Sequence, residues 1–316
     1  MNKSQKLFSS LLHLKTESRN TKSKNLDLMS VENILDLINK EDSRITKSIK
    51  KEKSKIKKVV SVVVNSFLTG GRLIYVGAGT SGRLGILDAA ECPPTFGVSS
   101  KMVLGLIAGG KKAVFKSQEG AEDNVKLGSL NIKKINVNNK DVVCGIAASL
   151  RTPFVFGALK EAKIRGAKTV LITTNPRKVL NSPTYSYLKK FVDISVCAEV
   201  GPEVLMGSTR MKSGTAQKLI LNMITTTSFV RIGKTYENMM VDLQLTNNKL
   251  RERAKKIIML ITGVGYKDAE KFLSISGGHV KTAIIMIKTK TSKSSAQKLL
   301  QQAGGFVRSA IKLSEK

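Results

Sequence analysis

The sequence has few of the residues from which disulfide frameworks, metal sites and histidine-based triads are built. Its 316 residues include three cysteines and two histidines. Cys92, Cys144 and Cys197 are widely spaced and form no CxxC pair, so the sequence predicts neither a disulfide framework nor a zinc site. His13 and His279 lack acidic or cysteine neighbours at ligand spacing, which argues against a histidine metal site and a Ser-His-Asp triad. We therefore expect no metal and a reducing compartment.

Long apolar segments are also missing. The chain has no run of about 18 uncharged apolar residues, and residues 1–20 show no apolar core followed by a small-residue cleavage site. The sequence therefore predicts a cytoplasmic protein that does not enter a membrane. Hydrophobic residues make up 41% and charged residues 24% of the chain, which is ordinary for a globular protein with a sizeable core.

Acidic residues are scarce beside basic ones. The chain has 54 Lys and Arg residues against 23 Asp and Glu residues, a formal net charge of +31. Such a charge raises nucleic acid as a partner. However, lysine is scattered through nearly every polar segment, and the aromatic content is 5% without tryptophan, so surfaces for base stacking are poorly supplied. We interpret the charge as a lysine-substituted surface and not as a nucleic-acid site.

The N-terminal part of the chain is predicted to be helical after a polar loop around TESRNTKSKN. Ser30 is placed to cap a helix over 30–42, whose apolar residues share one face. A second helix is expected over 44–71, where two glycines stop it. The expected divisions of the chain are an N-terminal helical segment at 1–60, a sheet domain at 61–226, a connecting helix at 227–250, and a helical bundle of three segments at 251–316.

Short apolar runs alternate with helical patterns in the middle of the chain. Strands that alternate with helices predict an α/β fold, with a parallel sheet covered by helices on both faces. Ligands of such sheets bind beyond the carboxyl ends of the strands, so the loops that open at Gly77, Ala108 and Ala148 should share one rim. The five runs are 72–79, 102–110, 141–149, 168–175 and 191–200.

A glycine-rich turn, GAGTSG, follows the first run. Gly77 and Gly79 let the backbone approach a ligand closely, and Thr80 and Ser81 open a helix whose free N–H groups favour an anion. The turn lacks the lysine of a P-loop and is not a dinucleotide GxGxxG followed by an acidic residue. A phosphate site is one interpretation, and a turn needed only for packing is the other.

A second loop, AASLRTPF, offers Ser149, Arg151 and Thr152 ahead of Pro153, which suits the first turn of a helix. Helix starts that carry hydroxyls after neighbouring strands could enclose one phosphate, or Ser149 or Thr152 serves only as a cap. The stretch GSTRMKSGTAQK has two similar interpretations, a ligand site for phosphate or carboxylate and a capped helix with a solvated basic face. Its polar residues are Ser208, Thr209, Arg210, Lys212 and Thr215.

Two carboxylate positions stand out in this acid-poor chain. Glu91 precedes Pro93 and Pro94, so a helix is expected to end near it and the prolines to hold a rigid loop. A rigid carboxylate suits an acid or a base. Glu122 lies with Glu119 and a further acid in SQEGAEDN, where the alternative is a negatively charged helix start.

Together these segments resemble the N-acetylmuramic acid 6-phosphate etherase family of the sugar isomerase (SIS) superfamily. The resemblance implies an SIS-type parallel sheet sandwiched by helices. It implies cleavage of the D-lactyl ether at carbon 3 by elimination and water addition, giving N-acetylglucosamine 6-phosphate and D-lactate in cell-wall recycling, without a cofactor or metal. It covers almost the whole chain through TESRN, LIYVGAGTSGRLGILDAAECPPTFG, GLIAGG, EGAEDN, GIAASLRTP, EVLMGSTRMKSGTAQKLILNM, MVDLQLTNNKLRERA and GGFVR.

The resemblance also assigns residues. The family's proton donor lies in the ECPPT segment and corresponds to Glu91, and its second carboxylate lies in EGAED and corresponds to Glu122, the expected base at carbon 2. Family members are homodimers. The related glucokinase regulatory protein supplies the alternative, a non-catalytic protein that senses sugar phosphate. The substrate and phosphate ligands expected by resemblance are Gly79, Thr80, Ser81, Ser149, Arg151 and Thr152.

Two positions depart from the family's pattern. Leu150 stands where the family usually has glycine, and Met206 where threonine is common. A side chain at Leu150 could crowd the phosphate or the backbone turn. We expect both departures to affect substrate affinity more than chemistry.

Overall fold

The computed structural model describes residues 13–245 and 247–315. They form two compact units. The first contains residues up to Ala89 together with Lys101–Ile224, and we call it the sheet unit. The second contains Ala90–Ser100 together with Thr225 onward, and we call it the helical unit.

The sheet unit is built on five parallel strands, which confirms the expected α/β fold. Their order is β2-β1-β3-β4-β5. All five residues of β1 and of β3 are buried, as expected for strands covered on both faces. The strands are β1 (Leu73–Gly77), β2 (Val103–Ile107), β3 (Val142–Ile146), β4 (Lys168–Thr173) and β5 (Ile194–Cys197).

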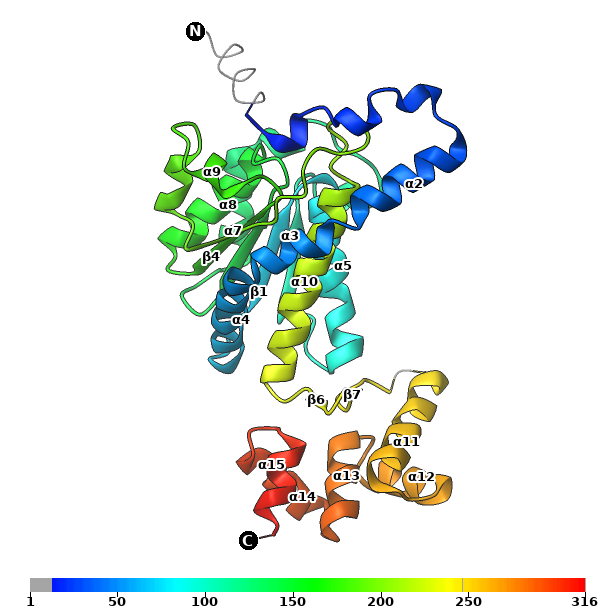
Figure 1. Ribbon diagram of the computed structural model, residues 1–316. Helices are drawn as coiled ribbons and strands as arrows, with labels where there is room; N and C mark the ends of the chain where they lie inside the picture. Colours follow the sequence, from blue (N-terminus) through cyan, green and yellow to red (C-terminus); the bar gives the residue numbers. More distant parts are fainter. Residues whose placement is uncertain (1–12, 246, 316) are drawn as a thin grey trace. The chain divides into compact units, whose positions relative to one another are not determined.

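Helices cover the two faces of this sheet (Figure 1). Successive residues of β3 point to opposite faces of the sheet, so their contacts show which helix covers each face. Gly145 lies so close to α8 (Pro153–Ile164) that an added Cβ would be 2.5 Å from Val155. Ile146 points the other way, toward α5 (Gly79–Phe96). The remaining helices of the sheet unit after β2 are α6 (Lys112–Phe115), η4 (Ala121–Asp123), α7 (Val125–Lys134), α9 (Arg177–Leu180), η5 (Ser186–Lys190) and α10 (Lys212–Arg231), of which α10 continues into the helical unit.

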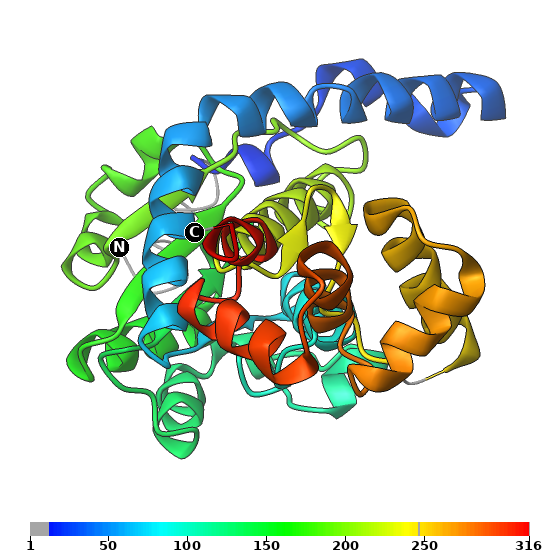
Figure 2. The same ribbon diagram turned by 90° about the horizontal axis from the view of Figure 1, so that it is seen from below.

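The N-terminal segment is helical, as expected, but its second helix is divided. Ser30 accepts a hydrogen bond from the Asn33 N–H and caps the first long helix, as predicted. The second helix is interrupted at Glu52, whose carboxylate binds the Arg177 side chain and the Cys197 N–H. Figure 2 shows the blue N-terminal helices bending sharply along the sheet unit. Residues 1–12 lie outside the described residues. The helices are η1 (Lys15–Glu17), η2 (Thr21–Ser23), η3 (Leu26–Leu28), α2 (Val31–Asp42), α3 (Ile45–Lys51) and α4 (Lys53–Leu68).

The prediction of a connecting helix over 227–250 is wrong for most of that range. α10 ends before Gly233, whose φ of +79° is left-handed. A short antiparallel hairpin follows, because Thr235–Tyr236 pairs with Met239–Met240 as β6 and β7. Within the described residues beyond it, the bundle has five helices where three segments were predicted. They are α11 (Asn248–Thr262), α12 (Tyr266–Ile275), α13 (Val280–Thr289), α14 (Lys293–Gln302) and α15 (Val307–Leu313).

The expected end of the helix near Glu91 is also wrong. α5 continues through Pro93 and Pro94 to Phe96. Proline has no N–H, so the carbonyls of Ala89 and Ala90 have no amide donor four residues later within the helix. The last turn of α5 is therefore held by fewer helical hydrogen bonds than an ordinary turn, and Glu91 lies on a helix and not on a loop.

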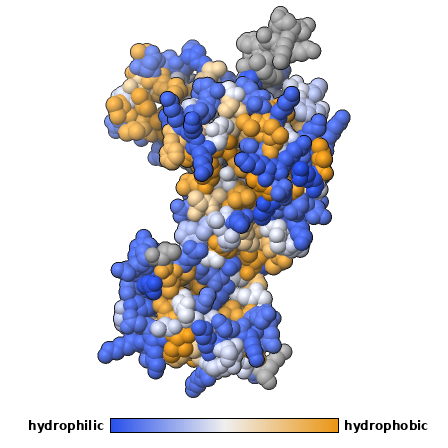
Figure 3. Space-filling model, turned by 180° about the vertical axis from the view of Figure 1, so that it is seen from behind, coloured by the Kyte–Doolittle hydropathy of each residue, from blue (hydrophilic) through white to orange (hydrophobic). Residues whose placement is uncertain are grey.

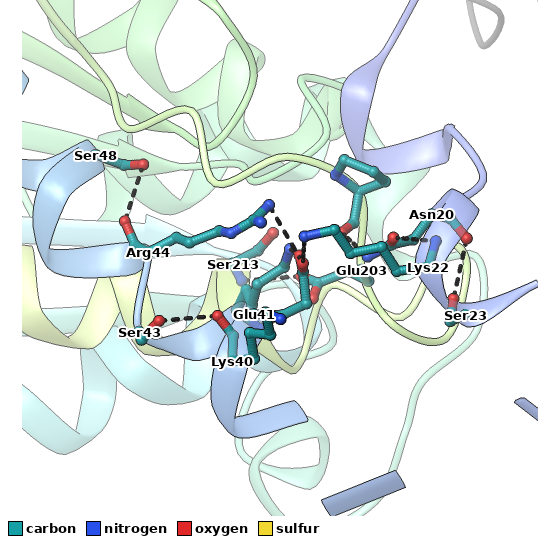
Figure 4. Close-up of polar contacts among 12 residues, drawn as sticks. Asn20, Lys22, Ser23, Lys40, Glu41, Ser43, Arg44, Ser48, Glu203 and Ser213 are labelled. Carbon is teal, nitrogen blue, oxygen red and sulfur yellow. Dashed lines mark hydrogen bonds and ion pairs between the residues drawn. The ribbon is translucent and has the colours of Figure 1, made fainter. Parts of the chain in front are cut away.

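Two buried glutamates hold the first turn of α10 (Figure 4). Glu203 accepts hydrogen bonds from the backbone N–H groups of Lys212 and of the next residue, at 3.0 and 2.9 Å, so it caps the helix. The Lys212 ammonium is 1% exposed and donates to Glu41 at 2.6 Å. Lys22 and Arg44 approach the other carboxylate oxygen of Glu41. This cluster joins α2, the loop after β5 and α10.

The face shown in Figure 3 is largely hydrophilic, and it also carries apolar side chains on both units. Val125, Leu130 and Ile164 are exposed on α7 and α8, and Leu260 is exposed on α11. Within the described part of the chain, no helix combines the length and apolar character needed to span a bilayer.

Replacing Glu41 by glutamine should destabilise the protein, because the Lys212 ammonium would stay buried without its counter-charge. We expect the free energy of unfolding to fall by about 3–5 kcal/mol, measured by denaturant unfolding at pH 7. The matched double variant, Glu41→Leu with Lys212→Met, removes both charges and should recover most of the loss. A loss below about 1 kcal/mol in the single variant would contradict this account.

The Glu41→Gln variant should also change how the free energy of unfolding depends on pH. Burial raises the pKa of Glu41, but the hydrogen bond and charge of Lys212, together with Arg44 and Lys22, outweigh it and hold the pKa below the ordinary 4.5. A lowered folded-state pKa contributes stability that is present above the unfolded-state pKa and is lost as the pH falls through the folded-state value. The free energy of unfolding should therefore fall below about pH 4.5, and less steeply in Glu41→Gln.

Candidate functional site

Three loops begin side by side at the carboxyl ends of the neighbouring strands β2, β1 and β3. Gly77 at the end of β1 is in register with Ile107 of β2 and with Ile146 of β3. The loops after these strands therefore open on one rim, as predicted from the sequence. They carry the glycine-rich turn, the acidic segment and the AASLRTP segment.

The glycine-rich turn leads directly into α5, whose first residue, Gly79, has a left-handed φ of +51°. Thr80 and Ser81 follow in the first helical turn, where backbone N–H groups have no helical partner. The Ser81 hydroxyl donates to Gln217 of α10 at 2.9 Å. Gly214 of α10 lies against Thr80, because an added Cβ would be 3.3 Å from the threonine methyl group. The first two turns of α10 therefore pack against this loop.

The second loop is held through its Ala148 carbonyl. This oxygen accepts hydrogen bonds from the side chains of Thr173 and Thr174 at the end of β4, and from Asn175 at 3.0 Å. Asn175 in turn accepts the Lys15 backbone N–H at 2.8 Å. The TESRN segment, which starts at the next residue, is therefore tied to the same rim.

The predicted ligands of the second loop lie at the start of α8. Pro153 is its first residue, as expected. Ser149 and Arg151 are half-buried. Thr152 is buried and its side chain makes no capping hydrogen bond to the helix, so capping by Thr152 is not its role in this structure. A hydroxyl and a guanidinium at a helix start can bind an oxyanion.

The backbone conformation of Leu150 is one that favours glycine, the residue expected at this position from the family resemblance. Its φ is +58°, in the left-handed region that favours glycine. Its side chain is 1% exposed and packs in the hydrophobic core with Leu14 and Phe154. Leu150 therefore fills the core beneath the loop and leaves the solvent side of the turn uncrowded. The second departure, Met206, is exposed on the loop that precedes α10.

Glu122 lies in η4, which packs against α8 and so comes close to Arg151. The residue is exposed, yet partial burial of its carboxyl group raises its pKa. The charges of Asp123 and Glu119 raise it further, and the charge of Arg151 opposes them. A carboxylate with a raised pKa is a stronger base than an ordinary glutamate once it is ionised.

Glu91 is exposed on α5, in the part of that helix that belongs to the helical unit. Its neighbour Cys92 is buried, so the helix fixes which face carries the carboxylate. The carboxylate of Glu91 lies on the exposed side of the helix, where a substrate can reach it.

The cluster predicted in GSTRMKSGTAQK is divided. Lys212 is buried against Glu41 and is not available to a ligand, nor does it lie on a solvated face. Arg210 and Thr215 are exposed. Sequence reasoning missed the two glutamates that organise this turn, Glu41 and Glu203, because they lie 171 and 9 residues from Lys212 and match no local motif.

No group of three histidine, cysteine or acidic side chains among residues 13–245 and 247–315 is arranged to hold a metal ion. His279 lies at the N-terminus of α13 in the helical unit.

Comparison with known proteins identifies the family. Residues 55–163 match the model of the glucokinase regulatory protein N-terminal SIS domain. The N-acetylmuramic acid 6-phosphate etherase of Salinibacter ruber is 52% identical over 282 residues, which are 89% of this chain and 88% of that protein. Its counterpart from Geobacillus sp. is 53% identical over 87% of this chain and 90% of its own length. N-acetylmuramic acid 6-phosphate etherase 2 of Vibrio cholerae is 49% identical over 88% of each chain. The chain therefore belongs to the N-acetylmuramic acid 6-phosphate etherase family.

Proposed function

We propose that this protein cleaves the D-lactyl ether of N-acetylmuramic acid 6-phosphate, releasing D-lactate and N-acetylglucosamine 6-phosphate. The observation that carries the proposal is the identity of about half of all residues to etherases over nearly the whole chain, with Glu91 and Glu122 both present. Two carboxylates, a phosphate site and a rigid sheet are the parts that this reaction needs.

The chemistry follows from the open-chain form of the sugar. Its aldehyde acidifies the hydrogen on carbon 2, and removal of that proton allows the bond from carbon 3 to the lactyl oxygen to break. The departing oxygen takes a proton and leaves as D-lactate, and carbons 2 and 3 become a double bond conjugated to the aldehyde. Water then adds, with its oxygen on carbon 3 and a proton on carbon 2, so one water is consumed for each ether cleaved.

Each carboxylate has one role in elimination. Glu122 is the base at carbon 2, and its raised pKa makes the ionised carboxylate a stronger base than an ordinary glutamate. Glu91 is the acid that protonates the departing lactyl oxygen, and it then takes a proton from the incoming water. The two groups must be in opposite protonation states when substrate binds, which is the usual requirement of paired acid–base catalysis.

Phosphate binding supplies orientation. Thr80 of the first loop, with Ser149 and Thr152 of the second, offers hydroxyl donors on one rim. Ser81, whose hydroxyl donates to Gln217, contributes its backbone N–H at the start of α5. Gly79 allows close approach of the backbone, and Arg151 adds a cation beside Glu122. Binding energy from the phosphate then holds carbons 2 and 3 against the carboxylates.

The family resemblance extends the proposal to the setting of the enzyme. We propose that it acts in the cytoplasm as a homodimer on a small sugar phosphate, without cofactor, metal, membrane or nucleic-acid partner. The alternative, a regulator that binds sugar phosphate without turnover, is supported by the match to a regulatory protein over 55–163. The etherase relatives cover far more of the chain, which favours catalysis.

Removing either carboxylate should strongly slow lactate release. We expect Glu91→Gln and Glu122→Gln each to lower kcat by about 10²- to 10⁴-fold, the usual contribution of a positioned acid or base, with D-lactate measured after incubation with N-acetylmuramic acid 6-phosphate. Glu199→Gln, at an exposed glutamate outside the proposed site, serves as the control and should keep wild-type activity. Substrate binding by the wild type without lactate release would favour the regulator instead.

The fall of kcat/KM on the acidic side of its pH profile, its acidic limb, should follow the ionisation of Glu122. Because the ionised form is the base, kcat/KM should fall as the pH falls through the raised pKa. Asp123→Asn removes a neighbouring negative charge, so it should lower the pKa of Glu122 and move this limb to lower pH. Glu119→Gln should move it in the same direction. A limb that stays in place or moves to higher pH in both variants would rule out Glu122 as the titrating base.

A further inference from the structure

The end of α5 that carries Glu91 is packed within the helical unit. Phe96, in the last helical turn, stacks on Phe229 with ring centroids 4.5 Å apart. Both rings are buried. Because Pro93 and Pro94 remove two helical donors from this turn, its position depends on such tertiary contacts more than that of an ordinary helix end.

The residue after the helix makes the closest of these contacts. Gly97 has a left-handed φ of +61°, and an added Cβ would lie 1.9 Å from the backbone oxygen of Asp242. Only glycine fits this approach. The end of the helix therefore rests directly on the backbone of Asp242.

Asp242 is itself fixed in two ways. Its neighbours Val241 and Leu243 are buried in the hydrophobic core of the bundle. Its carboxylate binds the ammonium groups of Lys281 at 2.6 Å and Lys234 at 3.1 Å. Lys281, on α13, is 8% exposed and also donates to the Gly305 carbonyl at 3.1 Å. One buried lysine thus ties α13, the start of α15 and the segment beneath Gly97 together.

We propose that Asp242 and Lys281 are positioning residues for Glu91. The ion pair fixes the Asp242 backbone, and this backbone supports Gly97. Gly97 and Phe96 in turn set the position and rotation of the last turn of α5, and the helix carries that position back to Glu91. The inference rests on the proposed function of Glu91 as the acid, and it gives the C-terminal bundle a role in the reaction. Neither residue needs to touch the substrate.

A kinetic comparison tests this role. Lys281→Met should lower kcat by about 10- to 100-fold, the cost of a misplaced catalytic group, and leave KM within about twofold of wild type because phosphate binding is elsewhere. Asp242→Asn, of nearly the same shape, should act in the same direction. Lys281→Arg keeps the charge and should restore much of the loss. In the Glu91→Gln background, Lys281→Met should cost nothing further, since it acts through Glu91.

Lys255→Met provides the matched control. Lys255 is 6% exposed in the same bundle, and its ion-pair partners are Glu252 on α11 and Glu270 on α12, not Asp242. This variant removes a similarly buried and paired lysine, so it should lose comparable thermal stability but keep kcat. If Lys281→Met lowers kcat no more than Lys255→Met, or if its loss adds to that of Glu91→Gln, the positioning role is overturned.

Hydrogen exchange separates this inference from the proposed function. The backbone amides of residues 91–97 should exchange faster in Lys281→Met and Asp242→Asn than in wild type or Lys255→Met, as measured by mass spectrometry of peptic fragments. An active wild type with unchanged exchange in these variants overturns the inference and leaves the function standing. An inactive wild type overturns the function, and the exchange rates then still decide whether the ion pair holds this turn.

Discussion

The first turn of α10 is the element on which the rim of the sheet unit depends. Glu203 caps it, and Glu41 compensates the one ammonium group buried there. The helix then meets the glycine-rich turn through Gln217 and the end of β4 through Ser213. Because a buried charge that loses its partner is costly, this turn has one stable arrangement. The loops that it supports are positioned by electrostatics from α2, more than 170 residues earlier in the chain.

The shortage of acidic residues makes their placement informative. Five of the acids in the described chain are buried, namely Glu41, Asp88, Asp141, Glu161 and Glu203. Most of these bind cations or backbone N–H groups. The interior therefore uses part of a small supply of negative charge for structure. The exterior is correspondingly more basic.

Local patterns in the sequence predicted the sheet and its loops. The features that these patterns missed depend on contacts between residues far apart in the chain. The five strands, the Ser30 cap and the shared rim follow from periodicity and from turn residues a few positions apart. The pair of Glu41 and Lys212 joins residues that no local pattern relates. The break at Glu52 arises from its contacts with Arg177 and β5. The helix continues past Pro93 because aromatic stacking and a close glycine contact hold its last turn. The two catalytic assignments depended on family motifs, since spacing alone favoured a structural explanation for both residues, which for Glu122 was an acidic helix start.

Leu150 also bears on how such loops change between relatives. A left-handed backbone costs a leucine about 1–2 kcal/mol, and burying its side chain contributes about 1.5–3 kcal/mol. The two terms are close in size, so glycine and leucine give this loop similar stability by different routes. This left-handed turn therefore does not require glycine for its stability when the side chain that replaces it can be buried beneath the loop.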